Sequence, residues 1–260
     1  MGKVLCFSNN KGGTLKTTTV VNLAGVISKR DKKKVLIIDC DFQSNVALSF
    51  GKNPDTFKGG LHDVLIDDKP PEDFIIKVHR RIDVLPATSN EIKFDFEVIA
   101  NPNYYKEPFR LMESTCEHLK EKYDYILVDT SPSLGLMTGN AFMFSDEVYI
   151  PYSPEGYSRR SLLKVIETIE WFKDQHNIHT EIKGVIPTLV KRSTRLHNDI
   201  MKQTKKFADK AGIRIFNNYV PSTIEFASSI GYKQKPLTLS RKTKFREVYF
   251  ELWKEMQGNE

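Results

Sequence analysis

Short apolar runs alternate along the chain with longer stretches in which apolar residues recur at helical spacing. The runs that we predict as strands cover residues 4–7, 35–39, 82–85, 125–129, 147–151 and 183–189. The helical stretches between them cover residues 16–28, 107–122, 160–176 and 195–211. Nearly continuous apolar strands are typical of a parallel sheet buried on both faces, and the helices between them supply crossover connections. The pattern predicts an α/β fold with a doubly wound, mostly parallel sheet flanked by helices.

The length of 260 residues and the hydrophobic content of 40% suit one domain spanning residues 1–260. Residues 51–108, rich in Pro, Asp, Lys and Asn, are expected to form surface loops around short helices. Because no run approaches ~20 apolar residues and the first strand starts almost at once, we expect a cytoplasmic protein without a signal peptide. Three distant cysteines favour buried thiols over a zinc site or a disulfide framework.

The net charge of +6 hints at a polyanionic partner, and its distribution says more than its total. No acidic residue lies between Glu225 and Glu247, whereas six basic residues do. The basic part of the chain is therefore its C-terminal third, residues 190–250. A run of three lysines, Lys32 to Lys34, is expected to be a solvated turn and is assigned no function from the sequence.

The first apolar run is followed by the sequence NNKGGTLKTT, from Asn9 to Thr18, which opens a helical stretch. A loop between a buried strand and a helix N-terminus directs several backbone N–H groups at one point, where a polyphosphate can bind. Lys16 would then reach the terminal phosphates and the Thr17 hydroxyl would ligate Mg²⁺. The ordinary pattern G-x-x-x-x-G-K-[ST] fails, because Asn10 and Leu15 occupy its glycine positions.

The pattern K-G-G-x-x-K-[ST] resembles the deviant Walker A loop of the ParA/MinD group of P-loop ATPases, with Lys11 as the signature lysine. The resemblance runs from about Lys3 to Trp253. It implies adenine contacts near Thr188 and Pro221. It also implies that eight consecutive loop residues contact the nucleotide: Lys11, Gly12, Gly13, Thr14, Leu15, Lys16, Thr17 and Thr18. In the family the signature lysine crosses a nucleotide-sandwich dimer, which implies an ATP-dependent homodimer here.

Two further strands end in carboxylates. The strand before Asp39 and Asp41 resembles the D-x-D-P-Q segment of the family, although Phe42 replaces the proline. By that resemblance Asp41 activates the attacking water, making Lys11, Lys16 and Asp41 the catalytic set, and Asp39 supports the magnesium shell. The strand ending at Asp129 resembles a Walker B motif, so Thr17, Asp39 and Asp129 are the expected metal residues.

Within the resemblance, the chain is most similar to ParA (Soj-type) DNA partition proteins. This implies ATP and Mg²⁺ as cofactors, slow ATP hydrolysis stimulated by a ParB-type centromere-binding protein, and nonspecific binding to nucleoid DNA without a membrane partner. An N-terminal helix-turn-helix domain is not expected. We assign DNA contacts to six basic residues: Lys191, Arg192, Arg195, Lys242, Lys244 and Arg246.

A MinD-like, membrane-associated positioning ATPase is the alternative, because apolar residues form a helical stripe from Phe245 to Met256. Such a stripe is more often core, and the acidic residues on its polar face disfavour anionic lipid. An iron–sulfur carrier of the same superfamily would require a close cysteine pair. One question about the loop stays open: Leu15 is strained if its φ is positive, and merely an outward-facing side chain if φ is negative.

Overall fold

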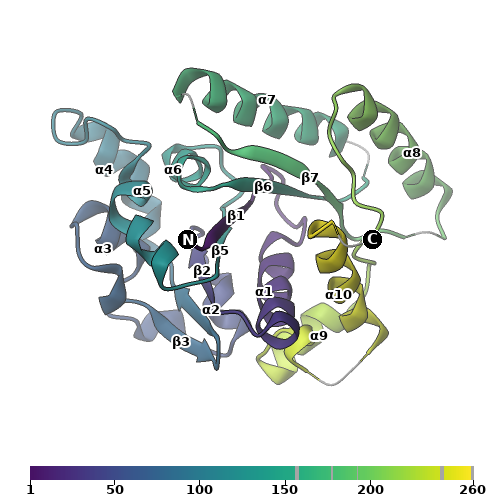
Figure 1. The fold of residues 1–260 in the computed structure, drawn as a ribbon, viewed down its shortest axis with the longest axis horizontal. Coiled ribbons are helices and arrows are strands. Elements are labelled where there is room, and N and C mark those ends of the chain that lie inside the picture. Colours follow the sequence, from purple (N-terminus) through teal and green to yellow (C-terminus); the bar gives the residue numbers. More distant parts are fainter. Residues whose placement is uncertain (156–157, 177, 192, 241–242, 259–260) are drawn as a thin grey trace.

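Parallel strands form the centre of the molecule (Figure 1). The computed structural model describes residues 1–155, 158–176, 178–191, 193–240 and 243–258, and within them the sheet has seven strands in the order β3-β4-β2-β5-β1-β6-β7. Every neighbouring pair is parallel except β3 with β4. The predicted doubly wound, mostly parallel sheet is therefore confirmed. The strands are β1 (Lys3–Phe7), β2 (Val35–Asp39), β3 (Ile76–His79), β4 (Ile82–Leu85), β5 (Tyr125–Asp129), β6 (Glu147–Tyr152) and β7 (Glu181–Pro187).

Helices cover both faces of this sheet, as Figure 1 shows. Alternate residues of β1 point to opposite faces, so Val4 and Cys6 enter one core and Leu5 and Phe7 the other. The first core is completed by α3 to α7 and the second by α1, α2, α9 and α10. The helices are α1 (Lys16–Val26), α2 (Asn45–Ser49), α3 (Leu61–Ile66), α4 (Phe94–Ala100), α5 (Leu111–Cys116), α6 (Leu136–Phe144), α7 (Ser158–His176), α8 (Arg195–Lys210), α9 (Glu225–Lys233) and α10 (Lys244–Met256).

The prediction of a single helix at 107–122 was wrong in its extent. The structure has α5 followed directly by a 3-10 helix at Glu117–Glu121. Similarly, α1 passes into a π-helical turn at Ile27–Asp31. Helix α6 was not predicted, because it is almost entirely buried and so lacks the polar face that gives a helical period.

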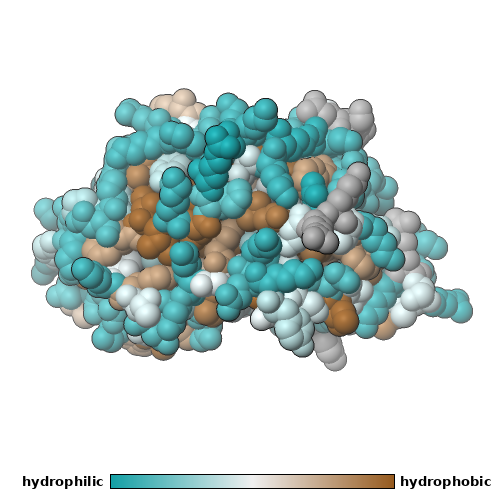
Figure 2. Space-filling model, turned by 90° about the horizontal axis from the view of Figure 1, so that it is seen from below, coloured by the Kyte–Doolittle hydropathy of each residue, from teal (hydrophilic) through white to brown (hydrophobic). Residues whose placement is uncertain are grey.

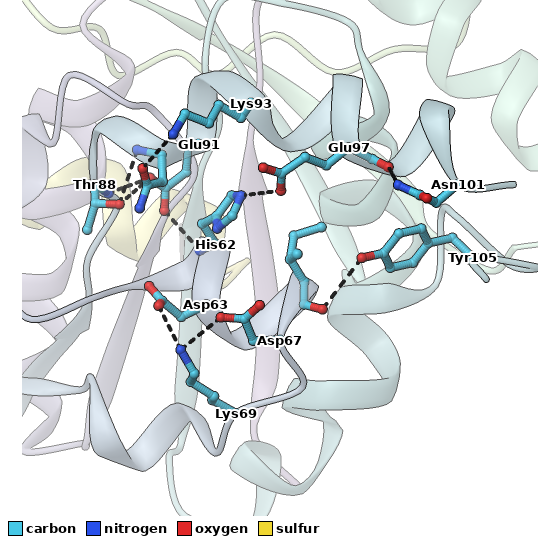
Figure 3. Close-up of polar contacts among 12 residues, drawn as sticks. His62, Asp63, Asp67, Lys69, Thr88, Glu91, Lys93, Glu97, Asn101 and Tyr105 are labelled. Atoms are coloured by element: carbon cyan, nitrogen blue, oxygen red, sulfur yellow. Dashed lines mark hydrogen bonds and ion pairs between the residues drawn. The ribbon is translucent and has the colours of Figure 1, made fainter.

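The irregular segment at 51–108 contains β3, β4, α3 and α4, and polar contacts join α3 to α4 (Figure 3). The ring of His62 on α3 lies 2.8 Å from the carboxylate of Glu97 on α4. Glu91 accepts hydrogen bonds from the backbone N–H groups of His62 (3.0 Å) and Thr88 (2.5 Å). Surface loops around short helices and the strand β4 were thus correctly expected, but β3 and its antiparallel pairing with β4 were not.

The apolar stripe of α10 is part of the core. Tyr249, Leu252 and Trp253 are at most 2% exposed, and α10 packs on α1. The Trp253 indole donates a 2.6 Å hydrogen bond to Asp31. Burial therefore accounts for the stripe.

Cys6, Cys40 and Cys116 are free and buried, as expected, and burial raises the pKa of Cys116 to about 12. No helix in the described ranges is long and apolar enough to cross a membrane. The face seen from below in Figure 1, to which β3, α1 and α9 lie nearest, is mostly hydrophilic with hydrophobic residues gathered in a hollow (Figure 2).

Candidate functional site

The carboxyl ends of β2, β5 and β1 bring the predicted motifs together. These three strands are neighbours in the sheet, and Asp129 at the end of β5 pairs in register with Asp39 of β2 and Phe7 of β1. The loop after β1 leads into α1, so its backbone lies beside both aspartates. Ligands of open α/β sheets bind at this edge.

Asn9 stabilises the loop through hydrogen bonds. Its buried side chain donates a 2.6 Å hydrogen bond to the carbonyl of Pro151, and its Oδ1 accepts from the backbone N–H of Lys11 at 2.9 Å. The ammonium group of Lys16 donates to the Asn9 carbonyl at 3.0 Å. Burial lowers the pKa of Lys16 below its ordinary value, and the charges of Asp129 and Asp41 oppose this shift in part. Lys16 is thus a cation fixed under the loop.

Leu15 has the left-handed backbone conformation, with φ 61° and ψ 33°. Gly13 also has a positive φ, of 73°. The loop therefore places a leucine where glycine is favoured, which settles the question left open by the sequence. The Leu15 side chain is partly buried and packs against the core beneath α1, so its contacts offset part of the backbone strain.

Asp129 is 1% exposed, and neither of its carboxylate oxygens has a hydrogen-bond partner among the described residues. Burial raises the pKa of Asp129 to about 7, whereas the nearby Thr17 hydroxyl and the Lys16 charge lower it. A buried carboxylate without a partner requires an explanation, and a bound cation is one that fits a charged group. A carboxylate beside a threonine hydroxyl is a donor set that Mg²⁺ accepts.

Asp39 and Asp41 have different surroundings. The Asp39 carboxylate is fully buried and accepts from the backbone N–H groups of Asp41 (3.1 Å) and Val46 (3.2 Å). Burial and then Asp129 raise the pKa of Asp39 well above its ordinary value. Asp41 is partly exposed. Asp39 therefore shapes the turn that carries Asp41, and its place in a magnesium shell stays a prediction.

A cavity of about 420 Å³ opens above the loop. Gly12 to Thr18 form one wall, and Asp41 lies in the same lining. Apolar side chains close the rim: Leu48 of α2, Pro132 and Ile230 of α9. The structure thus joins the predicted loop and the predicted catalytic aspartate in one site.

Lys11 lies apart from Lys16. It is partly exposed, and its ammonium group forms an ion pair with Glu155, which follows β6. This ion pair lowers the pKa of Glu155. Ser161 of α7 donates to the side chains of both Asn9 (3.1 Å) and Asn10. The sequence carried no signal for Glu155 or Ser161, because each lies more than 140 residues from its partner.

Thr188 and Pro221 belong to two segments that pair through their backbones. Thr188 is fully buried, and its hydroxyl donates a 2.9 Å hydrogen bond to the carbonyl of Thr14. Pro221 pairs with Val190 in an isolated bridge. Neither residue is in the lining of the 420 Å³ cavity, so Thr188 supports the loop and contact with adenine stays a prediction for both.

The residues assigned to DNA contacts are spread over two segments. Lys191, which precedes α8, and Arg195, the first residue of α8, are exposed, the Arg195 side chain at 96%. Lys244 begins α10 and is exposed, whereas the Arg246 side chain is 18% exposed and its guanidinium lies 4.7 Å from the Phe250 ring. Arg192 and Lys242 lie outside the described residues.

The family follows from comparison with known proteins. The family model described as AAA domain matches residues 2–182. A ParA family protein of Mycoplasma pneumoniae is 32% identical over 97% of this chain and 96% of its own length. The chain belongs to the ParA family.

Two further ParA-type relatives cover almost the whole chain. The sporulation initiation inhibitor protein Soj of Bacillus subtilis is 31% identical over 100% of both chains. A chromosome partitioning protein ParA of Myxococcus xanthus is 28% identical over 98% of this chain and 88% of its own length. The Soj-type resemblance seen in the motifs is thus confirmed over the full length.

Among solved structures, cobyrinic acid a,c-diamide synthase from Mycobacterium smegmatis, crystallised with an ATP analogue and magnesium, has the same fold. It matches with a TM-score of 0.84 and 23% identity over 100% of this chain and 97% of its own. At this identity the match concerns the fold alone.

Proposed function

We propose that this ParA family chain is a Mg²⁺-dependent ATPase that acts in the partition of plasmid or chromosomal DNA. The observation that carries the proposal is the buried Asp129 carboxylate without a hydrogen-bond partner among the described residues, beside Thr17 and the fixed Lys16 ammonium group. Such a site is incomplete without a cation and an anion. The magnesium complex of a nucleotide supplies both.

The residues of the site have separate roles in this proposal. The loop N–H groups and Lys16 bind the β- and γ-phosphates, and Thr17 and Asp129 hold the metal. The metal, when bound, neutralises charge that develops on the phosphates. Asp41 lies in the cavity lining, where it can orient a water molecule toward the terminal phosphate.

The second lysine of the loop suggests a switch between monomer and dimer. Lys11 is bound by Glu155 at the surface of its own chain, so its ammonium group does not occupy the cavity. We propose that ATP binding draws Lys11 across a sandwich dimer to the partner's phosphates and that hydrolysis returns it. The ATP dimer would bind nucleoid DNA without sequence preference, and a ParB-type centromere-binding protein would stimulate hydrolysis.

The test is the oligomeric state and DNA retention with ADP, ATP and a slowly hydrolysed ATP analogue. Lys11→Ala should abolish ATP-dependent dimerisation while keeping nucleotide binding, whereas Lys58→Ala, a change of another exposed lysine, should behave like the unaltered chain. A Lys11→Ala chain that dimerises and hydrolyses ATP normally would contradict the switch.

The MinD-like alternative loses its main support in the fold. The stripe that motivated it is buried between α10 and α1. Sedimentation with anionic liposomes and DNA gel shift, both with ATP, separate the two functions. We expect DNA binding, and retention on liposomes alone would favour the alternative.

A further inference from the structure

Basic residues gather at the edge of the sheet opposite to the phosphate loop. The parallel strands β4, β2, β5 and β1 are consecutive neighbours, and each is preceded or begun by cations. Their amino ends surround a cleft of about 1010 Å³. We call it the amino-edge cleft, and its cations are Lys3, Lys32, Lys33, Lys34, Arg80, Arg81, Lys120 and Lys122.

Half of these cations are already neutralised. Lys3, Lys33, Lys120 and Lys122 form ion pairs with Glu147, Asp124, Glu117 and Glu72, respectively. In the described ranges, no acidic side chain lies within ion-pair distance of the other four, which are Lys32, Lys34, Arg80 and Arg81. Glu121 and Asp124 are the acidic residues of the lining. The cleft therefore keeps an excess of positive charge.

The positive charge continues from the cleft toward the C-terminal third. His79, two residues before Arg81, has its pKa lowered by burial and then by the charges of Lys29, Lys235 and Arg81. The pKa of Lys29 is in turn lowered by burial and then by Arg246 and Lys235. Repulsion of this kind requires the cations to be close neighbours in space. A strip of like charge thus joins the cleft to the acid-free window of the sequence.

We propose that the amino-edge cleft binds closely spaced phosphate groups, namely the backbone of duplex DNA, as an extension of the basic C-terminal surface. Uncompensated cations in a concave site raise the local concentration of anions, and like charges this close are stabilised when a polyanion lies against them. The inference rests on the proposed function in one respect, the choice of DNA as the polyanion.

The position of the cleft separates it from the switch. All four strands run from the cleft to the nucleotide edge, so a sandwich dimer formed at the nucleotide edge leaves both clefts exposed at its outer ends. All of the cations belong to one chain. The cleft should therefore bind DNA weakly in the ADP state as well, in contrast to a surface that only the dimer completes.

The experiment is a fluorescence anisotropy titration of a labelled random-sequence duplex between 50 and 200 mM salt, in ADP and in the ATP analogue. The test variant combines Lys32→Gln, Lys34→Gln, Arg80→Gln and Arg81→Gln. The matched control also removes four exposed charges, through Lys58→Gln, Lys93→Gln, Lys106→Gln and Lys164→Gln. Thermal unfolding and ATP binding verify that both variants fold.

If each of the four cations contacts one phosphate, the slope of log K against log salt should be smaller in magnitude by ~3.6 for the test variant than for the unaltered chain. Over this fourfold salt range, the unaltered chain should then lose about 150-fold more affinity than the test variant. The control should keep the slope of the unaltered chain. Equal slopes for the test variant and the control would overturn the proposal. Inorganic polyphosphate should compete with the duplex at the cleft, and binding of polyphosphate without duplex would also overturn the assignment to DNA.

These results are distinguishable from a failure of the proposed function. The proposed function predicts an increase in DNA affinity when ADP is replaced by the ATP analogue, and the cleft variant should retain that increase. Loss of the nucleotide effect in the unaltered chain would refute the switch and leave the cleft intact. Loss of the slope difference would refute the cleft and leave the switch intact.

Discussion

Leu15 gives the sharpest test of the loop geometry. Its left-handed backbone, with φ 61° and ψ 33°, costs an L-residue about 1 to 2 kcal/mol that glycine does not incur. A direct exchange for glycine is ambiguous, because it also removes a side chain that packs partly in the core. Comparing Leu15→Gly with Leu15→Ala removes that ambiguity, since both variants lose the apolar side chain.

The expected difference follows from two opposing effects. Glycine avoids the steric cost but loses roughly 0.5 to 1 kcal/mol more conformational entropy than alanine on folding. We therefore expect Leu15→Gly to be more stable than Leu15→Ala by about 1 kcal/mol. Urea unfolding measures this difference, and a shift in the melting temperature of ~2 to 4 °C for a chain of this size accompanies it.

A pair of substitutions at Thr18, inside α1, provides the control. There the backbone is helical, so Thr18→Gly should be less stable than Thr18→Ala by about 1 kcal/mol. The sign of the difference between glycine and alanine should thus invert within three residues. If Leu15→Ala is as stable as Leu15→Gly, the left-handed conformation is not a source of strain and the reasoning fails.

Three further predictions concern packing, charge and the resting loop. The buried Glu255 accepts from two backbone N–H groups, and although burial raises its pKa, these hydrogen bonds bring it below its ordinary value. The ionised Glu255 carboxylate therefore stabilises the fold above about pH 4.5, and this stabilisation is lost as the pH falls through the lowered pKa. Glu255→Gln should cost about 1 to 3 kcal/mol at pH 7 and flatten the acid limb of an unfolding curve, unlike Glu251→Gln on the exposed face. Gly25→Ala should destabilise by about 1 to 3 kcal/mol in thermal unfolding because a Cβ there overlaps the 3-10 turn after α9, whereas Gly231→Ala in open space should be neutral or stabilising. Glu155→Gln frees Lys11 from a partly exposed ion pair worth ~0.2 to 1 kcal/mol, so sedimentation should show an ATP dimer up to about fivefold tighter. A weaker dimer would refute the idea that the ion pair with Glu155 holds Lys11 away from the dimer interface.

The sequence was sufficient for the parts of the fold that local pattern determines. The apolar runs at β1, β2 and β5 predicted parallel strands, and the carboxylates at two of their ends predicted where the site lies. The hairpin strand β3 was not predicted, because its residues are only half buried and show neither a continuous apolar run nor a clean alternation. The stripe of α10 favoured a core over a membrane surface in the sequence, and its packing against α1 confirms the core.

The sequence predicted the residues of the candidate site but not all of their contacts. Residues 11–18 and Asp41 were expected together, and residues 12–18 share a cavity with Asp41. By contrast, the Lys11–Glu155 ion pair depends on two loops that only the fold brings together. The absence of hydrogen-bond partners for Asp129 among the described residues is also a property of three-dimensional surroundings. Chemistry-bearing residue types can be read from a sequence, but the state in which the fold holds them cannot.

Strand order explains why the two charged regions of this chain are distinct. Lys32, Lys33 and Lys34 resemble an ordinary solvated turn when read in the sequence, since their partners in the cleft are distant along the chain. The order β4-β2-β5-β1 places that turn between Arg81 and Lys122, whose strands are its neighbours on either side. A parallel sheet thus separates the residues that precede its strands from the residues that come after them. Here the first group carries uncompensated cations and the second a phosphate loop with buried carboxylates, so a ligand at one edge leaves the other edge accessible.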